Sequence, residues 1–457
     1  MAAGVRSPVS DLESVSQSER QPFLNLAIDS VAAGGEGVGR DAEGRVIFVP
    51  RTAPGDRVRA RIVTARKRWA RAELVEIHQR GAGRRKPPCP LYDRCGGCAL
   101  QHLDIESQRD AKRTIIRESL RRIGGLEADL PPVSRSGKEF GYRNRVTLTL
   151  RRGPEDVWLG YHARLDPNTI LDVDDCLLAE TPVRKALTEL RANLGLAAGH
   201  LPAGQDLKIT IRCTEDGSVG LHVRGGSSDL TGRPDTVAAS VSALASYVQT
   251  CNDGTRTVLA GSESLSDRWQ GTRFELGPES FLQVNRDVSR SMDSTLDEWV
   301  GPRRGVRIAD LYAGVGARAI RWAREGAQVT AVESDLASVA SGRRAADAEG
   351  LQLEFIGARV ESVPDSFASA DVIVVNPPRA GLSGAVVESL LRPGSARGLA
   401  YVSCDPATLG RDLSLLASEW HPLAVRGFDA FPQTAHVETL VWMRRADKAA
   451  TTETEAA

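Results

Sequence analysis

Residues 306–320 read VRIADLYAGVGARAI, and this stretch decides the fold class. An apolar, strand-like run leads into Gly314-x-Gly316 and then into a helical pattern, an arrangement that lets a ligand approach the backbone at a helix N-terminus. Working outward, the pattern alternates. Strand-like runs are predicted at 327–333, 371–376, 399–403 and 437–443, with helices at 337–350 and 406–418. Such alternation predicts an α/β fold with a doubly wound, Rossmann-like sheet that is largely parallel and binds its ligand at the carboxyl ends of the strands.

Two further features of this region concern the ligand. Glu333 ends the second predicted strand, where a carboxylate can accept hydrogen bonds from ribose hydroxyls. A dinucleotide fingerprint prefers a third glycine where this chain has Ala319, so the glycine motif alone indicates only a nucleotide-like ligand. The run at 371–376 ends in Asn-Pro-Pro-Arg (376–379), a stiff turn with free backbone carbonyls. In methyltransferases of this architecture, substrate meets S-adenosylmethionine at that position, which makes NAD the less favoured cofactor.

A cysteine and a carboxylate lie at the same predicted edge of the sheet. Cys404 follows the strand at 399–403 and precedes a helix with Pro406 in its first turn, where the helix dipole favours a thiolate. Glu438 begins the last apolar strand, and a dry pocket would raise its pKa into the range of a general base. A lone cysteine is more often a buried apolar side chain, and a carboxylate at a strand entrance is often at the surface. Their shared edge favours chemistry instead: addition of a thiolate to carbon 6 of uracil, methylation of carbon 5, and removal of the carbon 5 proton.

The N-terminal part has a different pattern. Short strand-like runs broken by Gly and Pro predict a small OB-like β-barrel at 20–84. Between residues 40 and 86 there are 14 Lys and Arg against 5 Asp and Glu, and Trp69 lies in the densest basic stretch. A basic barrel with an aromatic side chain suits RNA, although a charged run can also be a solvated surface. A β-rich central domain is expected at 85–265, with a helix at 101–125 that can pack on the catalytic domain at 266–445; the polar ends, 1–19 and 446–457, are predicted to be disordered.

Three of the seven cysteines are close together, at Cys89, Cys95 and Cys98. An odd count and this clustering indicate a metal site with a fourth ligand elsewhere, rather than a disulfide framework. The spacing alone leaves zinc and an iron–sulfur cluster open.

Five motifs, in order, resemble the RNA 5-methyluridine (uracil-5-)methyltransferase family: FLQVN (281–285), DLYAGVG (310–316), VVNPPRAGL (374–382), YVSCDPATLGRDL (401–413) and FPQTAHVETL (431–440). The resemblance extends from residue 22 to 444, and the N-terminal barrel is similar to the TRAM domain. It implies that Cys404 is the nucleophile, that Glu438 is the base, and that S-adenosylmethionine is bound by Gln283, Tyr312, Glu333 and Asn376. It also implies a [4Fe-4S] cluster, with zinc as the lesser alternative, on Cys89, Cys95, Cys98 and Cys176, in a structural role.

The chain departs from the family pattern at three positions: Asn376 replaces the usual Asp, and Ala313 and Ala317 replace a frequent Cys and a polar residue. An amide keeps a hydrogen-bond acceptor but loses the charge-assisted bond. These departures motivate two alternatives. One is a methyltransferase acting on cytosine carbon 5 or on an exocyclic amine of RNA; the other is a non-catalytic RNA-binding iron–sulfur protein with a decayed cofactor site. Amine methyltransferases have no use for the pair Cys404 and Glu438, and an intact pair opposes a decayed site. Cytosine enzymes of the other large family use two cysteines on adjacent loops, whereas only Cys404 follows a predicted strand here.

Composition limits the setting of this activity. The 457 residues include 59 Lys and Arg and 59 Asp and Glu, which excludes binding of nucleic acid by overall charge. No apolar run approaches the roughly 18–20 residues that span a bilayer, and the first residues lack a secretion signal. We therefore expect a cytoplasmic, monomeric protein whose partner is RNA, with rRNA favoured over tRNA, and no membrane partner.

Overall fold

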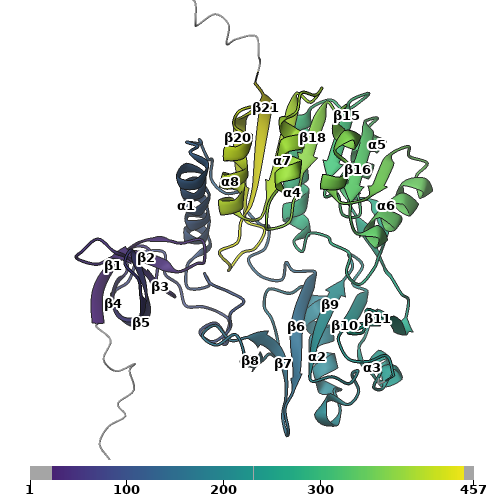
Figure 1. Cartoon of the computed structure of the whole chain (residues 1–457). Helices are drawn as coiled ribbons and strands as arrows, with labels where there is room; N and C mark the ends of the chain where they lie inside the picture. Colours follow the sequence, from purple (N-terminus) through teal and green to yellow (C-terminus); the bar gives the residue numbers. More distant parts are fainter. Residues whose placement is uncertain (1–22, 230, 447–457) are drawn as a thin grey trace, which may run out of the picture. The chain divides into compact units, whose positions relative to one another are not determined.

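The computed structural model describes residues 23–229 and 231–446, which form two compact units that meet in sequence between Arg85 and Lys86 (Figure 1). The predicted disordered segment 1–19 and nearly all of the predicted tail lie outside the described residues. Within these residues, no helix combines the length and the apolar character needed to cross a bilayer.

The first unit is a closed five-stranded barrel with strand order β1-β2-β3-β5-β4. Its strands are β1 (Phe23–Val31), β2 (Gly37–Arg40), β3 (Val46–Val49), β4 (Arg57–Ala65) and β5 (Trp69–Gln79). Alternating residues such as Leu26, Ile28, Ile47 and Val58 fill the interior, as period-2 patterning requires. The predicted barrel is confirmed, but β2 lies in a segment that we expected to be a glycine break. Gly37 belongs to a strand because it pairs with Val31 of β1 and Val49 of β3, and it must be glycine because a Cβ at this position would lie 1.9 Å from Oγ1 of Thr52.

The central part of the second unit is a seven-stranded sheet with order β12-β11-β10-β9-β6-β7-β8. The strands are β6 (Arg145–Arg152), β7 (Val157–His162), β8 (Ile170–Asp172), β9 (Asp206–Cys213), β10 (Val219–Arg224), β11 (Leu244–Thr250) and β12 (Arg256–Gly261). Helices α2 (Thr181–Ala192) and α3 (Pro234–Ser240) pack on it and bury one apolar face. A hairpin of β13 (Leu265–Trp269) and β14 (Thr272–Leu276) follows.

The C-terminal part is a second seven-stranded sheet, with order β17-β16-β15-β18-β19-β21-β20. Its strands are β15 (Arg307–Leu311), β16 (Gln328–Glu333), β17 (Glu354–Gly357), β18 (Val372–Val375), β19 (Gly398–Ser403), β20 (Trp420–Phe428) and β21 (Glu438–Arg445). The helices are α4 (Arg286–Val300), α5 (Ala317–Arg324), α6 (Leu336–Ala348), α7 (Gly384–Leu391) and α8 (Pro406–Leu416). Strands β15 to β19 are parallel, whereas β21 is antiparallel to both β19 and β20. The predicted doubly wound α/β fold is confirmed.

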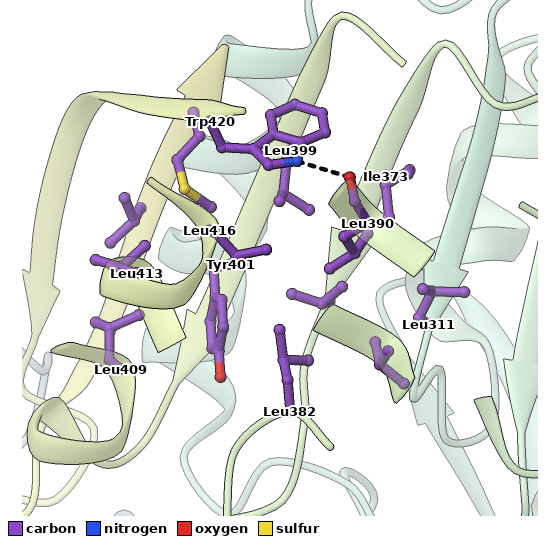
Figure 2. Close-up of a cluster of buried hydrophobic side chains, with 14 of the residues drawn as sticks. Leu311, Ile373, Leu382, Leu390, Leu399, Tyr401, Leu409, Leu413, Leu416 and Trp420 are labelled. Atoms are coloured by element: carbon purple, nitrogen blue, oxygen red, sulfur yellow. Dashed lines mark hydrogen bonds between the residues drawn. The ribbon is translucent and has the colours of Figure 1, made fainter. Parts of the chain in front are cut away.

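Two apolar clusters form the core of this sheet. Figure 2 shows one of them, in which the indole nitrogen of Trp420 donates a hydrogen bond to the carbonyl oxygen of Leu390 at 3.0 Å. Helix α1 (Ile105–Gly124) adds Ile116 and Leu120 to the same cluster. The N-terminus of α1 is capped by Asp104, which accepts from the amide of Ser107 at 2.8 Å. The helix from the segment before the central sheet is therefore part of the core of the C-terminal sheet.

Candidate active site

A cavity of about 910 Å³ opens where β15, β18 and β19 end. Because β21 is antiparallel to β19, its first residue lies at the same edge as the ends of the parallel strands. The cavity is lined by all six residues predicted for catalysis and cofactor binding: Gln283, Tyr312, Glu333, Asn376, Cys404 and Glu438. Residues far apart in the chain thus meet in a single site.

The turn after β15 forms one end of the cavity. Gly316 has a left-handed φ of 72°, and a Cβ there would lie 2.5 Å from the ring of Phe355. Glu333 fixes this turn, because its Oε2 accepts from the amide of Gly314 at 2.9 Å and its Oε1 from the amide of Asp335 at 2.8 Å. A carboxylate held in this way at the end of β16 is placed as ribose recognition requires.

Two side chains next to this turn have pKa values shifted by burial. Tyr312 has a left-handed φ of 62°, rare for a residue with a side chain, and burial raises its pKa to about 12, so the phenol is neutral. Burial also raises the pKa of Asp310 to about 6, and no described residue gives its Oδ1 a hydrogen bond, although Nη1 of Arg318 is 3.5 Å away. The only sequence signal for Asp310 is its place at the start of the motif DLYAGVG, just before the glycine turn.

Cys404 lies between β19 and α8, and the state of its thiol differs from the prediction. Burial, and then the negative charge of Glu438, raise the pKa of Cys404, so the expectation that the helix dipole favours a thiolate is wrong for the free protein. The first-turn amides of α8 are already satisfied, because Asp405 Oδ1 accepts from Ala407 at 3.0 Å and Thr408 at 2.9 Å. Arg379 opposes the increase through its charge and a hydrogen bond to the thiol.

Glu438 begins β21, and only 3% of this residue is exposed to solvent. Burial raises its pKa to about 7, against the lowering effect of the Arg379 guanidinium. A carboxylate with this pKa can both take and give up a proton near neutral pH. Arg379 thus influences both Cys404 and Glu438, a role that the sequence analysis did not assign.

Helix α8 fixes the loop that carries Arg379. The hydroxyl of Thr408 donates to the carbonyl oxygen of Arg379 at 3.0 Å. The fully buried Asp412 accepts from the amide of Leu382 at 2.8 Å and from the hydroxyl of Tyr401 at 2.6 Å. The Asn-Pro-Pro-Arg loop and the Cys404 loop are therefore bound to the same helix.

The rest of the cavity wall is cationic and aromatic, and includes Arg143, Arg145, Phe281, Phe431 and His436. The Arg143 guanidinium carbon is 5.6 Å from the ring centre of Phe431, within cation–π range. Burial, then the charges of Arg379 and Arg143, lower the pKa of His436 to about 4, so its imidazole is neutral at physiological pH. Such a wall can stack on a base and contact phosphates.

Comparisons with known proteins agree with this geometry. Family models match for tRNA (uracil-5-)-methyltransferases at 358–446, for the TRAM domain at 24–75 and for the methyltransferase small domain at 289–397. An RNA methyltransferase of Thermosynechococcus vestitus is 32% identical over 91% of this chain and 97% of its own length. A 23S rRNA (uracil(1939)-C(5))-methyltransferase of Chromohalobacter salexigens is 32% identical over 92% of this chain and 89% of its own length. The chain belongs to the RNA (uracil-5-)-methyltransferase family.

The fold agrees as well. The crystal structure of the Pyrococcus abyssi tRNA (uracil-54, C5)-methyltransferase in complex with S-adenosyl-L-homocysteine matches with a TM-score of 0.72 and 26% identity, over 92% of this chain and 99% of that one. The protein is thus an S-adenosylmethionine-dependent RNA methyltransferase with an N-terminal TRAM barrel. The alternative of a non-catalytic RNA-binding protein is not retained.

The methyltransferase keeps the backbone at its unusual Asn376 in place, since the amide donates to the carbonyl oxygen of Leu311 at 3.2 Å. The backbone position of residue 376 is therefore set by the sheet and does not depend on whether its side chain is an amide or a carboxylate.

The four predicted metal ligands of the methyltransferase are all partly exposed. Burial and then the charges of Cys176 and Cys95, against a hydrogen bond from Gln101, raise the pKa of Cys98 to about 12, and Cys176 also contributes to the raised pKa of Cys89. The thiols therefore lie close enough to influence one another. Over residues 23–229 and 231–446, however, no three or more Cys, His, Asp or Glu side chains are arranged to hold a metal ion. The metal site stays a prediction.

Proposed function

We propose that the enzyme methylates carbon 5 of a uridine in structured RNA, with rRNA favoured over tRNA, through a covalent bond between Cys404 and carbon 6. The observation that carries this proposal is the meeting of Cys404 and Glu438 in one cavity with the glycine turn and Glu333. Both side chains also interact with Arg379. Cytosine methyltransferases that use two adjacent cysteines have no counterpart here, because Cys404 is the only cysteine that lines this cavity among the described residues.

In the proposed mechanism, Gln283, Tyr312, Glu333 and Asn376 hold S-adenosylmethionine, which supplies an electrophilic methyl group when bound. Cys404 loses its proton to solvent, and Arg379 stabilises the thiolate. The sulfur then bonds to carbon 6, and the carbon 5–carbon 6 electron pair moves toward the carbonyl oxygen at carbon 4. Carbon 5 bonds to the methyl carbon as the bond from that carbon to the sulfonium sulfur breaks, which would release S-adenosylhomocysteine. Glu438 removes the carbon 5 proton, the double bond re-forms, and the thiolate leaves.

The choice of RNA is tested by labelling. Unmodified rRNA and tRNA would be incubated separately with the enzyme and methyl-labelled S-adenosylmethionine, digested and analysed by mass spectrometry. We expect 5-methyluridine in the rRNA, no label with Cys404→Ala, and wild-type label with Cys251→Ala, a buried cysteine outside the cavity. Label in 5-methylcytidine or in a methylated exocyclic amine would contradict the uridine proposal and support the alternative methyltransferase activities that Asn376 motivates.

We further propose that Cys89, Cys95, Cys98 and Cys176 hold a [4Fe-4S] cluster, with zinc as the lesser alternative. Four thiols are a suitable donor set for either group, and the proposal rests on the resemblance of the segment around Cys89, Cys95 and Cys98 to the cluster segment of the family. The group would stabilise the loop, because methyl transfer from a sulfonium needs no electrons. Iron, sulfide and zinc are to be measured after anaerobic purification. We expect about four irons per chain in the wild type, a loss in Cys176→Ser, and no loss in Cys251→Ser; metal-free wild-type protein would contradict the proposal.

A further inference from the structure

We infer that the Glu438 base is positioned from outside the cavity. The parts that position it are α1 and the segment 89–102, here called the cysteine-bearing segment, and they act through the turn 429–437. This turn, here called the base turn, connects β20 to β21 and ends directly before Glu438. The inference rests on the proposed function, since it concerns the base of that reaction. Gln108 and Lys112 are assigned as positioning residues; neither lines the cavity.

The need for such positioning follows from the surroundings of Glu438. No group among the described residues donates a hydrogen bond to its carboxylate, and its pKa responds only to burial and to the charge of Arg379. A general base works only when its oxygen is within hydrogen-bond reach of the proton that it removes. Without a hydrogen-bond donor among the described side chains, the direction of this carboxylate depends on the backbone that leads into β21.

A buried ion pair anchors the start of the base turn. Lys112 of α1 and Asp429 form this pair with 0% and 1% of their side chains exposed, and Lys112 Nζ also donates to the carbonyl oxygen of Phe431 at 3.0 Å. Buried ion pairs contribute little net stability against apolar substitutes, and their best-supported role is to select one arrangement. Here the arrangement selected is that of Phe431, which lines the cavity.

Two glutamines anchor the middle of the turn. Nε2 of Gln108 donates to Oε1 of Gln433 at 3.0 Å, and the amide of Gln433 donates to Oε1 of Gln108 at 2.8 Å. Both residues are fully buried, and Gln433 has a left-handed φ of 73°. A non-glycine residue in this region is strained, and surrounding contacts must offset the strain. Gln108 supplies two of these contacts.

The cysteine-bearing segment provides a third anchor. The amides of Ala99 and Leu100, which follow Cys98 directly, donate to the carbonyl oxygen of Gln433 at 3.1 and 2.9 Å. The hydroxyl of Tyr142 donates to the neighbouring carbonyl oxygen of Pro432 at 3.0 Å. Backbone hydrogen bonds thus connect the cysteine-bearing segment to the base turn.

The test exploits the order of the chemical steps. Addition of Cys404 and methylation precede the step that needs Glu438, so a misplaced base leaves RNA bound to the enzyme with its methyl group already attached. We would measure the methyl-labelled covalent complex on denaturing gels, and its rate of decay, for wild type, Glu438→Gln and Gln108→Met. The matched control is Gln249→Met, a buried glutamine of the central sheet that donates to the carbonyl oxygens of Gly225 and Ser227.

For Gln108→Met we expect the labelled complex to accumulate and its decay to slow on the order of 10–100-fold, because small displacements of a catalytic group have effects of that size. Binding of S-adenosylmethionine, measured by calorimetry, should be unchanged. Gln249→Met should show neither effect. Two results for Gln108→Met would overturn the positioning inference, provided that Glu438→Gln traps the complex. One is equal slowing of the formation and the decay of the complex, and the other is no slowing of either.

Failure of the proposed function is distinguishable, because then neither wild type nor Glu438→Gln forms any labelled complex. If Gln108→Met does not fold, the variant Gln433→Gly tests the inference instead. Glycine tolerates the left-handed φ and keeps the backbone bonds but removes the side-chain bond to Gln108. Accumulation of the complex in this variant supports the inference, and wild-type decay overturns it.

Discussion

In the proposed mechanism, the buried carboxylate of Glu438 sets the pH dependence of the last chemical step. Its pKa of about 7 means that below neutral pH it is protonated and cannot remove the carbon 5 proton. We predict that release of methylated RNA slows as pH falls below about 7, so that labelled covalent complex accumulates near pH 6 in the wild-type enzyme. Quenched-flow labelling across this range checks the prediction; a release rate that does not change with pH would contradict it.

The same pKa has a consequence for stability. Because the folded-state pKa of Glu438 is raised above the ordinary value of 4.5, its contribution to the free energy of unfolding is fully present below pH 4.5 and is lost as pH rises through about 7. Glu438→Gln removes this loss. We predict that the variant is more stable than wild type above pH 7, by on the order of 2–3 kcal/mol, with a smaller difference near pH 5. Urea denaturation at both pH values measures it.

The substitution Asn376→Asp restores the usual residue of the family by replacing the side-chain amide with a carboxylate. Charge-assisted hydrogen bonds contribute about 1.5–3 kcal/mol, and the backbone of residue 376 is already held by Leu311. We predict that Asn376→Asp increases kcat/KM for uridine methylation by about tenfold or more. Steady-state assays of kcat/KM, with Asn376→Ala as the comparison, test this prediction. Equal activity of the Asp and Asn forms would show that the carboxylate has no role here.

At the scale of elements, Asp412 of α8 holds together the loop after Asn376 and strand β19, which ends directly before Cys404. Its carboxylate accepts from Leu382 and Tyr401 and pairs with Arg411. We predict that Asp412→Asn lowers the free energy of unfolding by about 1–3 kcal/mol, because a buried acceptor set is disrupted, and lowers the rate of covalent complex formation as well. Asp371→Asn, which disturbs the more exposed pair with Arg307, is the control and should change stability by less than about 1 kcal/mol.

The sequence predicts these elements unevenly, for physical reasons. Five strands of the C-terminal sheet are apolar runs that the sequence predicts. It does not predict the other two, because β17 has only four residues and β20 contains Pro422 and polar residues. Parallel strands that share an edge account for the meeting of Tyr312, Glu333, Asn376 and Cys404 in one cavity. The other two predicted site residues reach it differently, since Gln283 precedes α4 and Glu438 begins the antiparallel β21. The protonation state of Cys404 and the role of Arg379 depend on burial and on neighbours distant in sequence, which no local pattern encodes.

At the scale of the whole molecule, the barrel is a compact unit with its own core. Its Trp69 is 37% exposed and lies edge-on to Phe48, with ring centres 6.3 Å apart. We predict that a chain comprising residues 86–457 folds and binds S-adenosylmethionine like the full protein, but binds RNA more weakly and with a smaller salt dependence. Affinity measured at several salt concentrations tests this; unchanged affinity would exclude an RNA contact by the barrel.

The position of β21 bears on how the enzyme is made. This strand is synthesised after every other strand of its sheet, yet it lies between β19 and β20 rather than at an edge. A growing chain that has passed Cys404 already contains Gln283, Tyr312 and the other predicted cofactor residues, while Glu438 is still missing. Because domains generally fold as units during synthesis, this sheet is complete only after its last strand has been made and has entered between β19 and β20.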